Sequence, residues 1–357
     1  MKKILTLVLC LTMVLTLATV FASCGKADYK LGMGVVVSMD SSATGNAQVD
    51  ATVAAVVTDA DGKIVACRID VAQNKMAVAN GAVKTDATFK TKMEKGSEYG
   101  MAGKVDNDGN GVKLEWDAQA KAFEAYVVGK TADEVKNMEL QEKNGHKIAV
   151  DQALLDAGCS MQITDFIDAV VKACNDDQGM SFQAKKDSFT LGVAAKTTAA
   201  DSVAATAEAN GTVKMYTDFA ACVVVDGAIV ASLNDAIQPD ITINVAGEIV
   251  AKAVGKTGTD NVLKVTKREQ KELYNMATYG ANLDPNNDGK VLEWYVQSAE
   301  FSKFVVGKTA AQVAALETAA NSIGYQMTTD ADLLAAGCTM QITAIKAVVA
   351  QSATNAR

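Results

Sequence analysis

A seven-residue block that carries a thiol next to a hydroxyl occurs twice in the chain. Residues 158–164 read Gly-Cys-Ser-Met-Gln-Ile-Thr, and residues 337–343 repeat them with Thr339 in place of Ser160. Each block follows a Leu-Leu pair and precedes an apolar, helix-like run. A turn of small residues that holds a hydroxyl is the best candidate site for chemistry in this sequence. The alternative is structural: a helix entrance in which Thr164 or Thr343 caps the next helix.

Two other motifs lack residues that their chemistry would require. A phosphate-binding loop needs a glycine five residues ahead of Gly-Lys-Thr, and the three such triplets have other residues there. We therefore interpret the triplets as a strand, a turn and a helix cap. A catalytic triad would have to use His146, the single histidine, which lies in a loop-like stretch, and multi-histidine metal sites are excluded. The triplets begin at Gly129, Gly255 and Gly307, and the upstream residues are Glu124, Val250 and Ser302.

Two acidic loops resemble the first half of an EF-hand calcium loop, with ligand-type residues at positions one, three and five and glycine at six. The twelfth position, which should be a bidentate Glu, is Asp117 in one loop and Tyr295 in the other. We therefore predict Asp/Asn/Gly turns and no metal site. The loops are Asp106, Asp108, Asn110 and Gly111 in the first half, and Asp284, Asn286, Asp288 and Gly289 in the second.

The first 24 residues have the pattern of a bacterial lipoprotein signal. Lys2 and Lys3 precede the apolar run 4–21, and small residues lead to Cys24. We predict that residues 1–23 are removed and that the Cys24 thiol is acylated, which anchors the protein on the extracytoplasmic face of the bacterial cell membrane. The alternative is an uncleaved membrane anchor.

Composition limits the partners and the cysteine chemistry. The formal net charge is −8, which argues against nucleic acid as a partner because phosphate backbones attract basic surfaces. Of 7 cysteines, Cys10 leaves with the signal and Cys24 is the lipid site. The remaining five contain no Cys-x-x-Cys pair, so neither a zinc knuckle nor a full disulfide framework is indicated. Cys67 and Cys222 lie in strand-like apolar runs, and we predict that both are buried.

Motifs in the same order divide the mature chain into two repeats, 24–178 and 187–351, with the boundary in the polar stretch 175–186. Such internal pairing predicts two domains of one fold. The paired segments are 61–66 with 226–231, 91–94 with 266–269, 99–101 with 274–276, 114–116 with 292–294, and 127–131 with 305–309.

Each repeat is predicted to begin with strands and to end with helices. Runs 49–58 and 63–71 flank an Asp-Gly turn, as do 213–225 and 228–233, and this pattern is typical of hairpins. One helix is expected after each of the capping boxes Thr131–Glu134 and Thr309–Gln312. A second begins near Thr164 or its twin, with apolar residues on one face. Segregated strands and helices predict an α+β fold, an antiparallel sheet with helices packed on it in each repeat. The apolar faces comprise Phe166, Ile167, Val170, Val171 and Cys174 in one repeat, and Ile345, Val348 and Val349 in the other.

Together these motifs resemble the FMN-binding domain family, which is found in sodium-pumping and related electron-transfer complexes and in surface flavoproteins. The family pattern is a hairpin with Asp-Gly-Lys-Ile, a Glu-Thr-x-Gly-like loop, a Phe-x-x-x-x-Gly-Lys segment, and Ser-Gly-Ala-Thr before a helix. The matching segments are 61–64, 94–101, 123–130 and 158–160 in the first repeat, and 226–229, 269–276, 301–308 and 337–339 in the second.

The resemblance implies a flavin site in each repeat. In that family the last hydroxyl of Ser-Gly-Ala-Thr carries FMN through a phosphoester bond, and Ser160 and Thr339 stand at this position. Such a bond calls for an exposed turn, small neighbours and a helix start that favours the negative charge. The implied cofactor-binding residues are completed by Gly158, Cys159, Glu94 and Tyr99 in the first repeat, and by Gly337, Cys338, Glu269 and Tyr274 in the second.

Two main functions follow as hypotheses. The first is a membrane-anchored flavoprotein that shuttles electrons to redox partner proteins through FMN. The second is a non-catalytic envelope lipoprotein that binds a ligand or has a structural role without flavin. A calcium-stabilised adhesion module is a third, and it rests only on the acidic loops.

Overall fold

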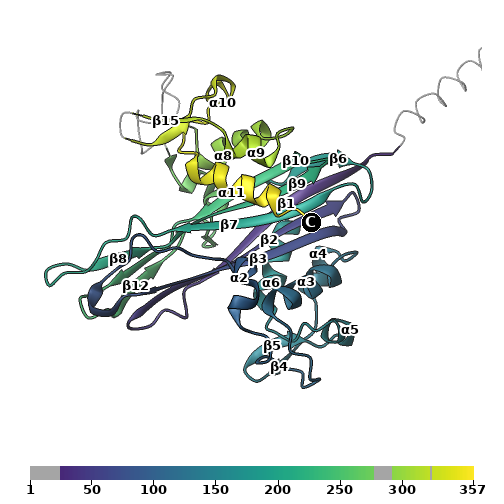
Figure 1. Ribbon diagram of the computed structural model, residues 1–357, viewed down its shortest axis with the longest axis horizontal. Helices are drawn as coiled ribbons and strands as arrows, with labels where there is room; N and C mark the ends of the chain where they lie inside the picture. Colours follow the sequence, from purple (N-terminus) through teal and green to yellow (C-terminus); the bar gives the residue numbers. More distant parts are fainter. Residues whose placement is uncertain (1–24, 277–291, 322–323) are drawn as a thin grey trace, which may run out of the picture.

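The computed structural model describes residues 25–276, 292–321 and 324–357. Antiparallel sheets lie in the middle of the molecule, and helices cover them on two opposite sides (Figure 1). The predicted α+β class is confirmed. The predicted signal segment 1–23, the lipidation residue Cys24 and the second acidic loop lie outside the described residues.

The first half contributes a four-stranded sheet with the order β3-β2-β1-β6. The predicted hairpin is confirmed as β2 and β3, joined by a turn in which Asp59 accepts hydrogen bonds from the backbone of Asp61 and Lys63. Strand β6 falls inside the predicted boundary stretch 175–186 and pairs with β1. The strands are β1 (Ala27–Ser38), β2 (Asn46–Asp59), β3 (Ile64–Ala77) and β6 (Met180–Ala184).

Besides two short hairpins, the second half forms two three-stranded sheets. The predicted hairpin is confirmed by β9 and β10, with Asp226 and Gly227 at positive φ as a two-residue turn requires. Pro239 separates β10 from β11, because proline has no N–H to donate to a strand ladder. One sheet has the order β10 (Ala228–Ile237), β9 (Tyr216–Val225), β7 (Thr190–Thr198); the other is β12 (Ile249–Ala253), β11 (Asp240–Ile243), β8 (Gly211–Lys214).

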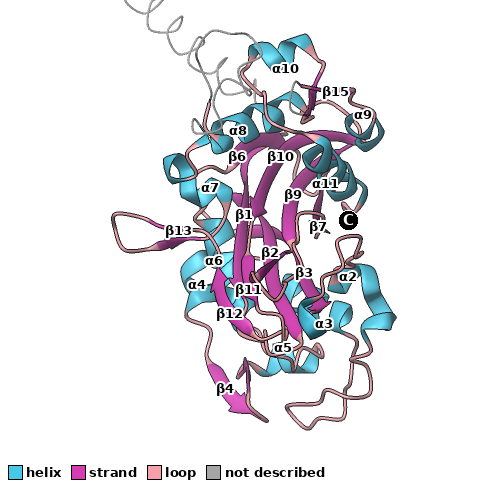
Figure 2. Ribbon diagram, turned by 90° about the vertical axis from the view of Figure 1, so that its left-hand side faces the viewer, coloured by secondary structure: helices cyan, strands magenta, loops and turns pink. Residues whose placement is uncertain are grey.

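Helices and short hairpins follow in the same order in each half (Figure 2). A short hairpin β13–β14 (Lys256–Thr257, Leu263–Lys264) projects from the second half, and a 3₁₀ turn η1 (Ala79–Gly81) follows β3. The first half has α2 (Lys92–Lys95), η2 (Gly96–Tyr99), α3 (Trp116–Tyr126), α4 (Ala132–Lys136), β4 (Leu140–Lys143), β5 (His146–Ala149), α5 (Gln152–Asp156) and α6 (Thr164–Cys174). The second has α7 (Lys267–Gln270), η3 (Lys271–Leu273), α8 (Trp294–Phe304), α9 (Ala310–Ala314), β15 (Thr318–Ala320), β16 (Gln326–Thr328), α10 (Ala331–Ala335) and α11 (Thr343–Thr354).

Both predicted capping boxes are present at the start of α4 and α9. The strand predicted ahead of Gly129 and Gly307 is wrong, because α3 and α8 occupy these segments. A helical signal was present: Trp116, Ala120, Phe123 and Val127 recur at helical spacing, and all four are buried. The Gly-Lys turns bond instead to the strands, with Gly129 N–H donating to the Ile64 carbonyl at 2.7 Å and its counterpart Gly307 to that of Ile229 at 2.8 Å.

The core has three parts, set by the alternation of side chains along the strands. Leu31, Val53 and Phe219 belong to the cluster between the sheets, which draws on both halves. The other strand faces pack against the helices of their own half and include the buried thiols of Cys67 and Cys222, as predicted. The sheets thus bury one face against each other and the other against helices, so the halves share a core.

Candidate functional site

The glycine of each Gly-Cys block ends a short helix. Gly158 follows α5 with φ +89°, and its N–H donates to the Leu155 carbonyl, while Cys159 N–H donates to that of Leu154. Gly337 repeats this after α10, also with φ +89°. A Cβ at Gly158 would lie 2.4 Å from a methyl carbon of Leu114. Helix termination and close packing therefore account for both glycines.

The two candidate hydroxyls are buried, which corrects the expectation of an exposed turn. Ser160 is 1% exposed and Thr339 is 4% exposed. The cause is a buried glutamine on the neighbouring helix. Gln119 Oε1 accepts the backbone N–H groups of Ser160 and Met161, both at 3.0 Å.

The second half repeats this glutamine clamp. Gln297 Oε1 accepts the N–H groups of Thr339 at 2.8 Å and Met340 at 2.7 Å, and its own amide donates to the Leu292 carbonyl. Burial also raises the pKa of the thiols of Cys159 and Cys338 to about 12, so neither thiol is a nucleophile near neutral pH. The clamp therefore closes both blocks against α3 and α8.

Thr164 and Thr343 do begin helices, but the predicted caps are absent. The N-cap residues are Ile163 and Ile342, and neither has a side-chain cap hydrogen bond. The hydroxyl oxygen of Ser160 is buried and has no hydrogen-bond partner. The Gly-Cys block is thus a packed helix entrance with one unsatisfied hydroxyl.

The glutamates implied by the family resemblance have a structural role. Glu94 accepts the backbone N–H of Thr91, which in turn caps α2, so the two form a capping box. Glu269 forms the same box with Thr266 at α7. These contacts explain why a Thr and a Glu recur at this spacing in both halves.

The tyrosine of the first half borders a basic concavity of about 480 Å³. The ring of Tyr99 lies 4.9 Å from the Lys92 ammonium and 5.8 Å from that of Lys95. Burial and the neighbouring lysines lower the pKa of Lys95. Ser160 does not line this concavity. Its lining residues are Gln73, Lys75, Lys95, Glu98, Tyr99, Gly100, Met101, Lys104 and Val105. Tyr274, the equivalent tyrosine, has a similar environment: its ring lies 4.9 Å from the Lys267 ammonium and 5.8 Å from that of Lys256, and its hydroxyl donates to Gln238.

The acidic loop of the first half packs over the Gly-Cys-Ser turn. Asn107 donates to the Ser160 carbonyl at 2.8 Å, and Asp106 accepts the Gly111 N–H. Within residues 25–276, 292–321 and 324–357, no group of three or more His, Cys, Asp or Glu side chains is placed to hold a metal ion. His146 is exposed and begins β5.

A pair of equivalent buried aspartates was missed in the sequence. Asp70 Oδ1 accepts the N–H groups of Val71 and Met93, and Asp235 Oδ1 accepts those of Ala236 and Arg268. Burial raises the pKa of both carboxyl groups to about 6. Each aspartate therefore ties a strand to the following helix. The signal was visible, since both stand nine residues after the aspartate of the hairpin turn.

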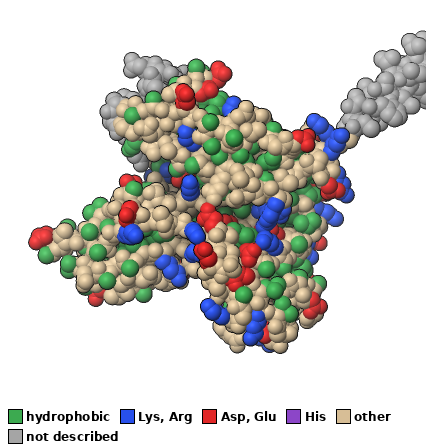
Figure 3. All heavy atoms as spheres, viewed as in Figure 1, with side chains coloured by type: hydrophobic (Ala, Val, Ile, Leu, Met, Phe, Trp, Pro, Cys, Tyr) green, Lys and Arg blue, Asp and Glu red, His purple; other side chains and the backbone are tan. Residues whose placement is uncertain are grey.

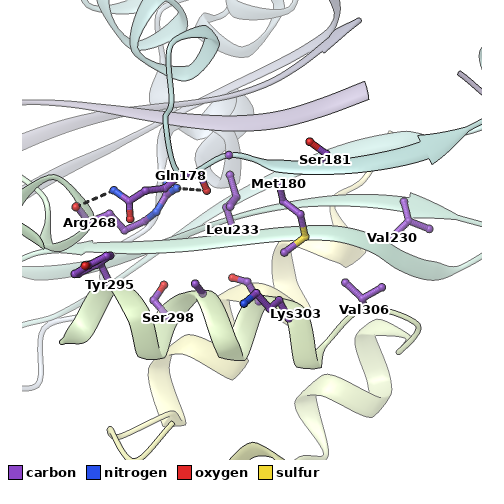
Figure 4. Close-up of a pocket in the computed structure, with 13 residues that line it drawn as sticks. Gln178, Met180, Ser181, Val230, Leu233, Arg268, Tyr295, Ser298, Lys303 and Val306 are labelled. Atoms are coloured by element: carbon purple, nitrogen blue, oxygen red, sulfur yellow. Dashed lines mark hydrogen bonds between the residues drawn. The ribbon is translucent and has the colours of Figure 1, made fainter. Parts of the chain in front are cut away.

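The last turn of each half crosses onto the other half and lines a pocket there. In the first half the pocket is about 270 Å³, lies between β3, α2 and α3, and includes Arg357 from the end of the chain. In the second half it is about 530 Å³, lies between β10, β6 and α8, and includes Gln178 (Figure 4). Counted from the two Gly-Cys blocks, Gln178 and Arg357 hold equivalent positions.

Comparisons with known proteins add no identity. No protein-family model matches the chain, and no curated protein or solved structure gives a significant match. On the face seen in Figure 3, acidic and basic side chains are interspersed.

Proposed function

We propose that this protein is a lipid-anchored envelope lipoprotein that binds a ligand or partner and carries no covalent flavin. The observation that supports it is the burial of Ser160 and Thr339 beneath the glutamine clamps. An enzyme that attaches FMN must reach the hydroxyl, and here each turn would have to leave its helix first. Breaking a clamp leaves two buried N–H groups unpaired, at about 1–3 kcal/mol each.

The tandem FMN-binding-like architecture is part of the proposal. Its support is the equal order of helices and hairpins in the halves, together with the equivalent clamps and capping boxes. In this proposal the family fold is retained in two copies, 24–178 and 187–351, while the attachment turn has become part of the packing.

The anchor rests on the signal pattern and the predicted acylation of Cys24. Strand β1 begins at Ala27, so an acylated Cys24 would hold the folded part close to the membrane surface. Among the residues that the structure describes, no helix is long and apolar enough to cross a membrane.

Intact-mass analysis of protein from its native host tests the anchor and the flavin together. We expect a mature chain beginning at Cys24 with acyl groups and without added FMN mass, and we expect Cys24→Ala to release the protein from membranes. Peptides with FMN on Ser160 or Thr339, lost in Ser160→Ala or Thr339→Ala, would refute the flavin-free proposal. Membrane retention of a processed Cys24→Ala chain would refute the lipid anchor.

One observation favours the electron-carrier alternative with non-covalent FMN. The concavity beside Tyr99 presents Lys75, Lys95 and Lys104, and its volume suits a cofactor-sized ligand. Its ammonium groups and aromatic ring would suit a phosphate and a planar ring system.

Titration of purified protein with FMN tests this alternative, with flavin fluorescence as the signal. If it is correct, FMN binds at one site per chain, and Lys75→Gln with Lys95→Gln weakens binding at least about tenfold. The control is Lys264→Gln, at a lysine outside the concavity. Absence of saturable binding rules out FMN at this concavity.

A further inference from the structure

The pocket in each half lies at an equivalent place, but only the first contains a buried glutamate paired with two arginines, a cluster called here the plug. Glu124, on α3, is buried there. It lies 3.6 Å from an Arg68 nitrogen and 3.0 Å from an Arg357 nitrogen. Arg68 also donates to the Arg357 carbonyl. The end of the second half therefore fills the pocket of the first.

The same three positions carry smaller or neutral residues in the second half. When the hairpin and α3 of the first half are aligned with the hairpin and α8 of the second, Leu233 stands at the position of Arg68 and Ser302 at that of Glu124. Gln178 takes the place of Arg357. The plug is thus absent from this pocket, and its volume, about 530 Å³, exceeds the roughly 270 Å³ of its counterpart.

The walls of this second-half pocket are mainly apolar. Met180 extends from β6, Val230 and Leu233 from β10, and Val306 follows α8 on the opposite side (Figure 4). The volume falls within the range of pockets that enclose small organic ligands. Burial of apolar surface would therefore drive binding.

The charged side chains at this pocket, Arg268 and Lys303, are already paired. Arg268 donates to both carboxylate oxygens of Asp176, at 3.1 and 3.0 Å, and to the Gln178 carbonyl. The Gln178 amide donates back to the Arg268 carbonyl. Lys303 is paired with Glu300 at 2.7 Å, and its side chain is 63% exposed. The pocket thus presents apolar walls and charges that are already compensated.

The hydroxyl groups of Ser298 and Ser302 are engaged as well. Ser298 donates to Asn234, and the amide of Asn234 donates to Ser302. A charged ligand group would lose its hydration here without gaining an unpaired counter-charge.

We propose that the second-half pocket binds a small, uncharged, largely apolar molecule. The inference rests on the proposed function, since it names the ligand class of the binding protein. The first half shows that side chains fill this place when they are large and charged. In the second half the ligand takes that space, between the end of one half and the sheet and helix of the other.

Titration of the complete folded protein with the neutral fluorescent probe N-phenyl-1-naphthylamine tests the proposal. We expect saturable binding at one site per chain. Val306→Trp or Val230→Trp should weaken it at least about tenfold by occupying the pocket. The matched controls are Val128→Trp and Val65→Trp at the equivalent positions of the first half; Val128 and Val306 are similarly exposed, 48% and 43%. We expect these controls to bind the probe as the unaltered protein does.

A double substitution that copies the plug residues of the first half tests the same pocket in a second way. Leu233→Arg with Ser302→Glu places the first half's arginine and glutamate in the second pocket and should abolish probe binding. Circular dichroism and the melting temperature report whether each variant is folded. Absence of saturable binding in the unaltered protein, or equal loss in the Val128→Trp control, overturns the proposal.

The charge of the ligand is tested by competition. A long-chain alcohol should displace the probe at least as well as the carboxylate of the same chain length. A carboxylate that displaces it about tenfold better overturns the assignment to uncharged ligands.

The result is separable from that of the flavin experiment. FMN found on Ser160 or Thr339 would refute the proposed function, whereas the probe titration reads a pocket that neither residue lines. Conversely, if the probe does not bind but the intact mass shows no FMN, the ligand class is refuted while the flavin-free proposal stands.

Discussion

The end of each half packs against the other half, which gives two equivalent junctions. These junctions place their buried charges at different positions. In the first half the buried carboxylate is Glu124 on α3, paired with Arg68 and Arg357. In the second half the buried pair is Arg268 on α7 with Asp176, both less than 10% exposed. At the junction on the first half, Met93 and Asn355 hold the equivalent positions.

Each junction contains a buried charge only where a partner of opposite charge is also present. An arginine at position 268 comes with an aspartate at 176, while Met93 comes with Asn355. A buried ion pair adds little net stability over a neutral pair, yet loss of one partner leaves an uncompensated charge. Each buried charge at a junction therefore depends on its partner from the other half.

The largest effect is expected when the buried pair is broken. Arg268→Met alone, or Asp176→Asn alone, should lower the free energy of unfolding by about 3–5 kcal/mol, because one buried charge loses its partner. The double variant copies the first half and should recover most of that loss. Urea denaturation of the four proteins measures the coupling. Additive losses in the double variant would contradict the pairing argument.

An intermediate effect is expected from the two buried aspartates. Their pKa is raised from 3.8 to about 6 in the folded protein, so between these values the folded state binds more protons than the unfolded state. The free energy of unfolding should therefore fall as pH rises from about 4 to about 6, by on the order of 3 kcal/mol for each carboxyl group.

Asp70→Asn and Asp235→Asn should each flatten this pH dependence by a similar amount. Melting temperature between pH 4 and pH 7 measures it. Burial also raises the pKa of Asp218 to about 6. This residue is unchanged in both variants, so its contribution to the pH dependence of stability remains in each. A variant whose profile keeps the slope of the unaltered protein would show that its carboxyl group does not titrate in this window.

The smallest effect is expected at the helix caps. Thr131→Ala and Thr309→Ala each remove a side-chain acceptor at the start of α4 or α9. Each should cost about 1 kcal/mol. Because Glu134 adds a negative charge near the N-terminus and Gln312 does not, raising the salt concentration should weaken the first cap more. Equal salt dependence of the two variants would remove this distinction between the halves.

The parts of the fold that could be predicted were those with local causes. The hairpins follow from Asp-Gly turns, and the starts of α4 and α9 follow from capping boxes a few residues long. Helix α3 was not predicted, because the Gly-Lys-Thr triplet after it was interpreted as following a strand, although the apolar residues ahead of the triplet recur at helical spacing. Glu94 was predicted to bind a cofactor because the motif alone could not show that its carboxylate caps α2.

Only part of the candidate site could be predicted from the sequence. The sequence alone determined that the two Gly-Cys blocks are equivalent and that each brings a hydroxyl to the entrance of a helix. Burial of these hydroxyls depends on tertiary packing, because the clamp on Ser160 comes from a glutamine 41 residues away. The pocket of the first half is equally non-local, because Arg357 bonds to Glu124 across a separation of 233 residues. Burial depends on which distant segments pack together, and local residue patterns do not specify that packing.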